Sequence, residues 1–173
     1  MNPIEAARNQ RLQSLRLEFV AFDAMSAQQL YAVLQLRSEV FMLEQDCVFQ
    51  DMDGADAQAM HLLGTDAEVD ELVAYARCFA PGVKFAQASI GRVLTRSSMR
   101  GCGLGHVLMK KAMAGLVAQW GEQAIRIGAQ ARLEDFYRQH GFAAVGQPYI
   151  EDGIPHIEML RPANFQFYSG VKK

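Results

Sequence analysis

Three of the six residues in the stretch Arg100-Gly101-Cys102-Gly103-Leu104-Gly105 are glycine. Because glycine lacks a Cβ, the backbone of such a stretch can come close to an anion. The stretch lies between a predicted strand and a predicted helix, and the first N–H groups of a helix have no intrahelical acceptor. The pattern therefore predicts a phosphate-binding turn, and a strand-to-helix turn without a ligand is the alternative.

The spacing of these glycines excludes two phosphate-binding motifs. A P-loop requires a Gly-Lys pair, and the chain contains none. A dinucleotide-binding fingerprint counted from Gly101 requires glycine at the position that His106 occupies. The pattern that does fit is Arg-x-x-Gly-x-Gly, from Arg100 to Gly105.

The turn is positioned by a strand expected at residues 88–95 and a helix expected at residues 103–120, where apolar residues recur every four positions. Ser26 and Gln29 have the spacing of a capping box, which predicts the start of another helix at about 27–43. The other expected elements are strands at 15–21, 61–65, 72–79, 124–129, 142–145 and 156–160 and a short helix at 133–140.

The order of these elements predicts the fold class. Strand, helix, three strands, helix, strand, helix and two strands indicate an α+β fold, in which helices flank a mixed, partly parallel central sheet. We expect a single domain over residues 15–162. A tail or short helix at 1–14 precedes it, and a tail at 163–173 follows it.

The composition restricts the class of protein. The 173 residues are 50% hydrophobic and 21% charged, with a net charge of −2, which fits one soluble domain and argues against a basic nucleic-acid-binding protein. No apolar run reaches the ~18 residues of a membrane span, and the first residues lack the apolar core of a signal peptide. The three cysteines lack metal-ligand spacing. We therefore expect a cytoplasmic protein that binds no metal, membrane or nucleic acid.

Together with the preceding strand, Ile90 to Thr95, the turn from Arg100 to Gly105 resembles the corresponding segment of the GNAT family of N-acetyltransferases. The resemblance implies a GNAT-like acyl-CoA N-acyltransferase fold with acetyl-CoA as co-substrate. It also implies that the turn wraps the pyrophosphate, while the backbone of Val93 to Thr95 pairs with the pantetheine arm as if with an added strand. The coenzyme-binding residues implied are Val93, Leu94, Thr95, Arg100, Gly101, Cys102, Gly103, Leu104, Gly105, Gln130 and Tyr137.

A second segment, Gln130 to Phe142, is similar to the family's short helix that carries a Phe-Tyr pair and ends at Gly-Phe. The resemblance gives Tyr137 the role of catalytic acid facing the sulfur of coenzyme A. A phenol with an ordinary pKa of ~10 can donate a proton to a departing thiolate. Packing on the sheet is the alternative for Tyr137 and the preferred interpretation for Phe136.

Longer strings narrow the resemblance to the ElaA-like branch of the family. The resemblance implies direct transfer of the acetyl group to a primary amine of a small molecule or peptide, with an N–H near Val93 or Leu94 polarising the thioester carbonyl. It leaves monomer and homodimer open. The strings are Leu36 to Gln45, Asp51 to Asp56 with His61, and Tyr149 to Met159.

The residue that takes the proton of the amine is not defined by the resemblance. Many relatives carry an acid on the strand before the glycine turn, but Ser89, Gly91 and Val93 occupy the alternate positions there. Each substitute candidate has a structural alternative, such as a solvated helix end or an ion pair. The missing carboxylate also motivates an alternative function, a non-catalytic acyl-CoA-binding regulatory module. The candidates on the acceptor side are Glu44, Asp53, His61, His156 and Glu158.

Overall fold

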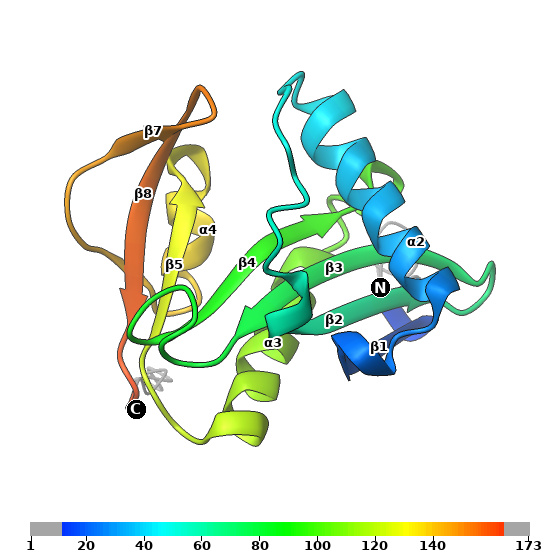
Figure 1. The fold of residues 1–173 in the computed structure, drawn as a ribbon, viewed down its shortest axis with the longest axis horizontal. Helices are drawn as coiled ribbons and strands as arrows, with labels where there is room; N and C mark the ends of the chain where they lie inside the picture. Colours follow the sequence, from blue (N-terminus) through cyan, green and yellow to red (C-terminus); the bar gives the residue numbers. More distant parts are fainter. Residues whose placement is uncertain (1–11, 165–173) are drawn as a thin grey trace, which may run out of the picture.

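The computed structural model describes residues 12–164, so most of the two expected tails lies outside it. An eight-stranded sheet has the strand order β1-β2-β3-β4-β5-β8-β6, and β7 pairs with β8 (Figure 1). Neighbouring strands are antiparallel except β4 and β5, which are parallel. The strands are β1 (Leu15–Ala21), β2 (Ala59–Asp66), β3 (Glu71–Phe79), β4 (Ala88–Thr95), β5 (Ile125–Gln130), β6 (Ala143–Ala144), β7 (Tyr149–Glu151) and β8 (Ile154–Arg161), and the α-helices are α2 (Ala27–Arg37), α3 (Leu104–Trp120) and α4 (Glu134–Arg138).

The predicted α+β architecture with a mixed, partly parallel sheet is confirmed, and three elements differ in detail. The helix expected at about 27–43 is α-helical only to Arg37 and continues as the π-helical segment η2 (Ser38–Glu44). The short helix expected at 133–140 is α-helical only over α4. Strand β7 was not expected. Its three residues are all exposed, and a strand with no buried face need not show the alternation of apolar and polar side chains on which the prediction relied.

Helices cover both faces of the sheet. In Figure 1, α2 lies in front of the sheet, and α3 and α4 lie behind it. Leu104 and Leu108 of α3 are buried in the larger core behind the sheet. Val33 and Leu36 of α2 pack with Leu94 of β4 in a smaller core on the opposite face. The two faces of the sheet therefore pack against different helices, α2 on one face and α3 and α4 on the other. Within residues 12–164, no helix is both long and apolar enough to cross a membrane.

The two parallel strands separate along their length. Over the described residues, β4 and β5 pair only at Ala88 with Ile125 and at Ser89 with Arg126, and Figure 1 shows them diverging beyond that point. The register between β3 and β4 is irregular near Arg92, whose φ angle is +50°. Such a bulge bends a strand away from its neighbour. The last residues of β4 thus face a gap, which we call the β4–β5 gap.

Candidate active site

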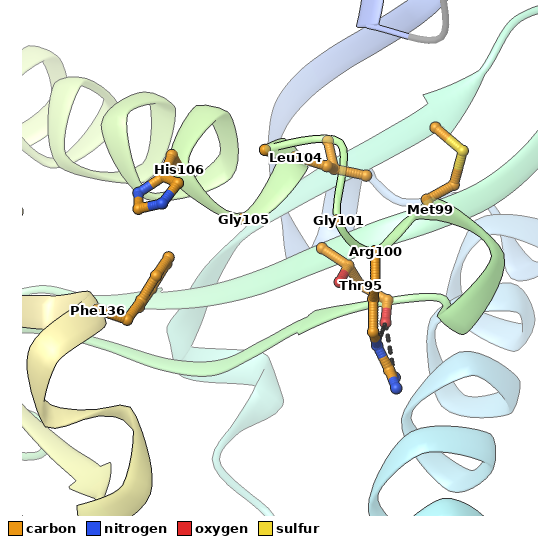
Figure 2. A pocket seen from close by; sticks show the side chains of 9 residues that line it. Thr95, Met99, Arg100, Gly101, Leu104, Gly105, His106 and Phe136 are labelled. Carbon is orange, nitrogen blue, oxygen red and sulfur yellow. Dashed lines mark hydrogen bonds between the residues drawn. The ribbon is translucent and has the colours of Figure 1, made fainter. Parts of the chain in front are cut away.

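The glycine-rich turn borders a cavity of about 310 Å³ (Figure 2). Gly101 and Gly103 adopt φ angles of +76° and +86°, which residues with a Cβ rarely adopt. Gly103 immediately precedes α3, so the N–H groups of Leu104 and Gly105 lie in the first helical turn, without intrahelical acceptors. A helix start of this kind suits an anion. The cavity is lined by Thr95, Met99, Arg100, Gly101, Gly103, Leu104, Gly105, His106 and Phe136.

The side chain of Arg100 binds Thr95 and Glu44, and it does not bind the start of α3. Its guanidinium donates to the carbonyl oxygen of Thr95 from Nε at 3.1 Å and from Nη2 at 3.0 Å (Figure 2). Nη2 also lies 2.5 Å from Oε2 of Glu44. Arg100 therefore connects the end of β4 to the end of η2, and these contacts hold the first residue of the glycine-rich turn in place. Glu44, one of the acceptor-side candidates, belongs to this connection.

Cys102 contributes its side chain to the core and not to the cavity. Its thiol is buried and donates to the carbonyl oxygen of Met99 at 3.0 Å. The residue packs in the same core as Leu104. Any contact of Cys102 with a ligand in the cavity is therefore left to its backbone.

Tyr137 lies in the core behind the sheet, next to the cavity. Its ring packs edge-on against Phe136 at 5.1 Å and Phe142 at 6.1 Å between centroids. Burial raises the pKa of Tyr137 to about 12, so the phenol is protonated at neutral pH. Its hydroxyl makes no hydrogen bond with any residue that the structure describes. Tyr137 therefore has a proton and no fixed acceptor for it.

Sequence reasoning did not predict the part of the cavity wall formed by His106 and Phe136. Their rings lie 4.8 Å apart, and Nδ1 of His106 lies 2.9 Å from Nε2 of the buried His140. Burial lowers the pKa of His140 to about 4, so His140 is neutral near pH 7. One sequence feature could have indicated this. His106 directly follows the glycine-rich stretch and lies in the first turn of the expected helix.

The expected coenzyme contacts lie on both sides of the β4–β5 gap. Val93 to Thr95 form the end of β4, and Gln130 ends β5. The Gln130 amide donates to Oε1 of Gln45 at 3.0 Å and accepts from Nε of Arg132 at 2.9 Å. Because Gln45 directly follows η2, the bond from Gln130 connects the end of β5 to the end of η2, which Arg100 connects to β4.

Asp53 is held in an ion-pair network beside β3. Its carboxylate accepts from Nη1 and Nη2 of Arg77 at 2.8 and 2.7 Å, and Lys84 lies 3.3 Å away. The hydrogen bonds from Arg77 hold the pKa of Asp53 well below its usual range. A carboxylate in this state is a poor proton acceptor.

His61 is fully buried next to the same network. Its Nε2 lies 3.0 Å from the carbonyl oxygen of Asp56, and its Nδ1 lies 2.8 Å from the hydroxyl of Tyr75. Since a carbonyl can only accept, Nε2 carries the proton and Nδ1 accepts from Tyr75. Burial lowers the pKa of His61. Both ring nitrogens are thus engaged within the protein.

His156 and Glu158 lie on β8 and face away from α3 and α4, because the alternating residues Ile157 and Met159 are buried in the core on that side. Oε2 of Glu158 lies 2.5 Å from Nη1 of Arg126. Nδ1 of His156 lies 2.8 Å from the carbonyl oxygen of Ile154. The structure therefore brings these two candidates together, on the strand next to β5.

Tyr149 completes this surface, and sequence reasoning gave it no role. Its ring stacks on His156 at 5.8 Å. A Cβ added to Gly128 would lie 2.8 Å from the Tyr149 hydroxyl, so glycine is what permits the ring to lie over β5. Asp152 and Gly153, both at positive φ, join β7 to β8. Their Asp-Gly pair was the pattern that could have predicted this hairpin.

Comparison with known proteins decides the family. A model of the acetyltransferase (GNAT) domain matches residues 21–161. The chain belongs to the GNAT family. Protein ElaA of Escherichia coli K12 is 44% identical over 139 residues, which cover 79% of this chain and 90% of ElaA. The resemblance to the ElaA-like branch is thereby confirmed.

Solved structures agree with this assignment. The crystal structure of Escherichia coli ElaA has a TM-score of 0.79 at 40% identity and covers 85% of this chain and 99% of its own. An acyl-CoA N-acyltransferase from Pseudomonas aeruginosa has a TM-score of 0.79 at 38% identity and covers 84% and 99%. This GNAT chain therefore has the acyl-CoA N-acyltransferase fold, and its family membership supports acyltransferase activity with an acyl-CoA donor.

Proposed function

We propose that this protein transfers the acetyl group of acetyl-CoA directly to a primary amine of a small molecule or peptide. One observation carries the proposal. The β4–β5 gap opens beside the glycine turn, so a single extended ligand can place its phosphates on the turn and its arm in the gap. The ligand that combines a diphosphate, a long amide-bearing arm and a transferable acyl group is an acyl-CoA.

The described residues suit the two parts of this substrate. The backbone from Gly101 to Gly105 offers N–H groups at a helix start, which bind phosphate oxygens without a charged side chain. The end of β4, from Val93 to Thr95, lacks a strand partner in the gap, and the amides of the pantetheine arm can pair with such an edge. Leu94 or Val93 then offers an N–H near the thioester carbonyl.

The transfer balances without a covalent enzyme intermediate. The amine nitrogen forms a bond to the thioester carbonyl carbon, the C–S bond breaks, and the thiolate takes the proton of Tyr137, which is later restored from solvent. A base on the enzyme takes the proton that the amine loses. The protein contributes mainly by holding the reactants in position, and effective molarities from positioning are large.

Release of free thiol tests the proposal. The purified protein is incubated with acetyl-CoA and a panel of primary amines, and the acetylated product is identified by mass spectrometry. We expect amine-dependent thiol release that exceeds release without amine. Butyryl-CoA and octanoyl-CoA, used in parallel, test the preference for acetyl. If no amine increases thiol release, direct N-acetyl transfer is wrong.

The alternative function, a non-catalytic acyl-CoA-binding regulatory module, is favoured by one feature. The alternate positions Ser89, Gly91 and Val93 of β4 carry no carboxylate. This module would bind acetyl-CoA in a calorimetric titration and release no thiol with any amine. Binding together with amine-dependent release excludes it.

A further inference from the structure

We infer that His156 is the base that removes the proton of the attacking amine, and this inference rests on the proposed N-acetyl transfer. The first observation concerns the two ring nitrogens. Nδ1 of His156 lies 2.8 Å from the carbonyl oxygen of Ile154, and a carbonyl only accepts, so Nδ1 carries the proton. The lone pair of the neutral ring is then on Nε2, which has no hydrogen-bond partner among residues 12–164.

The location of His156 relates it to the β4–β5 gap. On the neighbouring strand, His156 is paired with Gln130, the last residue of β5. Strand β5 forms one side of the gap. The side chain of His156 lies on the face opposite α3 and α4, whereas Tyr137 lies in the core on their side. A thioester in the gap would thus have the base on one face of the sheet and the acid on the other. The amine can approach from one side while the sulfur departs toward the other.

The ring of His156 is held in place by its neighbours. Tyr149 stacks on it at 5.8 Å, and the bond to Ile154 fixes its rotation. Burial first, and then the charges of Glu151 and Glu158, raise the pKa of Tyr149. The ionisable groups around His156 come from four elements: β7, β8, β5 and the 3-10 segment η5 (Ala131–Leu133). These groups are Tyr149 and Glu151 on β7, Glu158 on β8, Arg126 on β5, and Arg132, which is bonded to Gln130.

The other candidates are already engaged. Glu44 binds Arg100, and Glu158 binds Arg126. Asp53 binds Arg77, and His61 uses both ring nitrogens. Among the five acceptor-side candidates, His156 is the one that is not paired with an arginine and has a ring nitrogen without a partner among residues 12–164.

The test replaces the base while keeping its local hydrogen bond. In His156→Asn, the amide N–H can donate to the Ile154 carbonyl in place of Nδ1–H, but the lone pair of Nε2 is lost. Two probe amines are used with acetyl-CoA: n-butylamine, which is protonated at pH 7, and methoxyamine, which is neutral. Loss of a general base should reduce kcat/KM for n-butylamine by about 100-fold and leave methoxyamine within about threefold. Pro155→Ala, at the exposed neighbouring position, is the matched control and should keep both rates.

A second measurement needs no acceptor. In two-dimensional NMR of ¹⁵N-labelled protein above the pKa of the ring, we expect the proton of His156 on Nδ1 and an unprotonated Nε2. A proton on Nε2 overturns the inference, and so does an equal loss for both amines in His156→Asn, since that outcome indicates a purely structural role. If the wild-type protein acetylates neither these probes nor any amine of the panel, the proposed function and the inference fall together. If it acetylates both and His156→Asn does so equally well, the inference alone falls.

Discussion

Replacing Gly101 by alanine separates a backbone role in ligand binding from a role in folding. The φ angle of Gly101 is +76°, and an added Cβ would meet no described heavy atom within 4 Å. Gly82, in the loop between β3 and β4, has a φ angle of +84° and the same open space. Gly101 lines the cavity and Gly82 does not. Gly82→Ala is therefore a matched control, with the same backbone strain and no contact with the ligand.

The magnitudes follow from this geometry. An alanine in the left-handed region costs about 1–2 kcal/mol, and neither substitution adds a steric clash within the described structure. In a chain of this size, each kcal/mol lowers the melting temperature by about 2–4 °C. Both variants should therefore melt about 2–8 °C below the wild type without ligand.

The variants should differ once coenzyme A is added. A ligand at 100 times its Kd stabilises the native state by about 2.7 kcal/mol, and tenfold weaker binding reduces this to about 1.4 kcal/mol at the same concentration. We expect Gly82→Ala to keep the full increase in melting temperature and Gly101→Ala to lose half of it or more. Differential scanning fluorimetry with a coenzyme A titration measures both. An identical increase in the two variants would refute a diphosphate-binding turn at Gly101.

Three other substitutions probe the acid, the core and the ion-pair network. Tyr137→Phe should lower kcat by about 100-fold with little change in the Kd of coenzyme A; equal turnover would remove the acid role. Gly115→Ala places a Cβ 2.8–3.0 Å from ring atoms of Phe19, so urea unfolding should show a loss of about 1–3 kcal/mol, and an unchanged midpoint would contradict this packing. Asp53→Asn should cost about 1–3 kcal/mol at pH 7. Because the folded-state pKa of Asp53 lies below its ordinary value of 3.8, the wild type should lose this advantage as the pH falls through 3.8 and below, and a constant difference down to pH 2 would contradict the pairing with Arg77.

The glycine turn could be predicted from the sequence because its requirements are local. Positive φ angles at Gly101 and Gly103 and a helix start at Leu104 involve only neighbours in the chain. Residue type carries this information directly, since glycine alone adopts such angles at low cost. The order of strands and helices, apart from β7, was predicted for the same reason, from the spacing of apolar residues along each segment.

The sequence could not show which acceptor-side candidate is the base. The candidates are distinguished by the partners that the fold gives them and not by residue type. The sequence shows carboxylates at Glu44, Asp53 and Glu158, but only the fold brings an arginine against each of them. The exposed strand β7 gave no periodic pattern, so the ring of Tyr149 over β5 was not foreseen either.

The sequence by itself determined the family, the order of the elements other than β7, and the turn beside Gly103. The tertiary structure alone decided that β4 and β5 separate after two paired positions and that Nε2 of His156 has no hydrogen-bond partner in the described part of the chain. Both features depend on residues distant in the chain, because a bulge opposite β3 bends β4 and each polar side chain finds its partner only when the strands assemble.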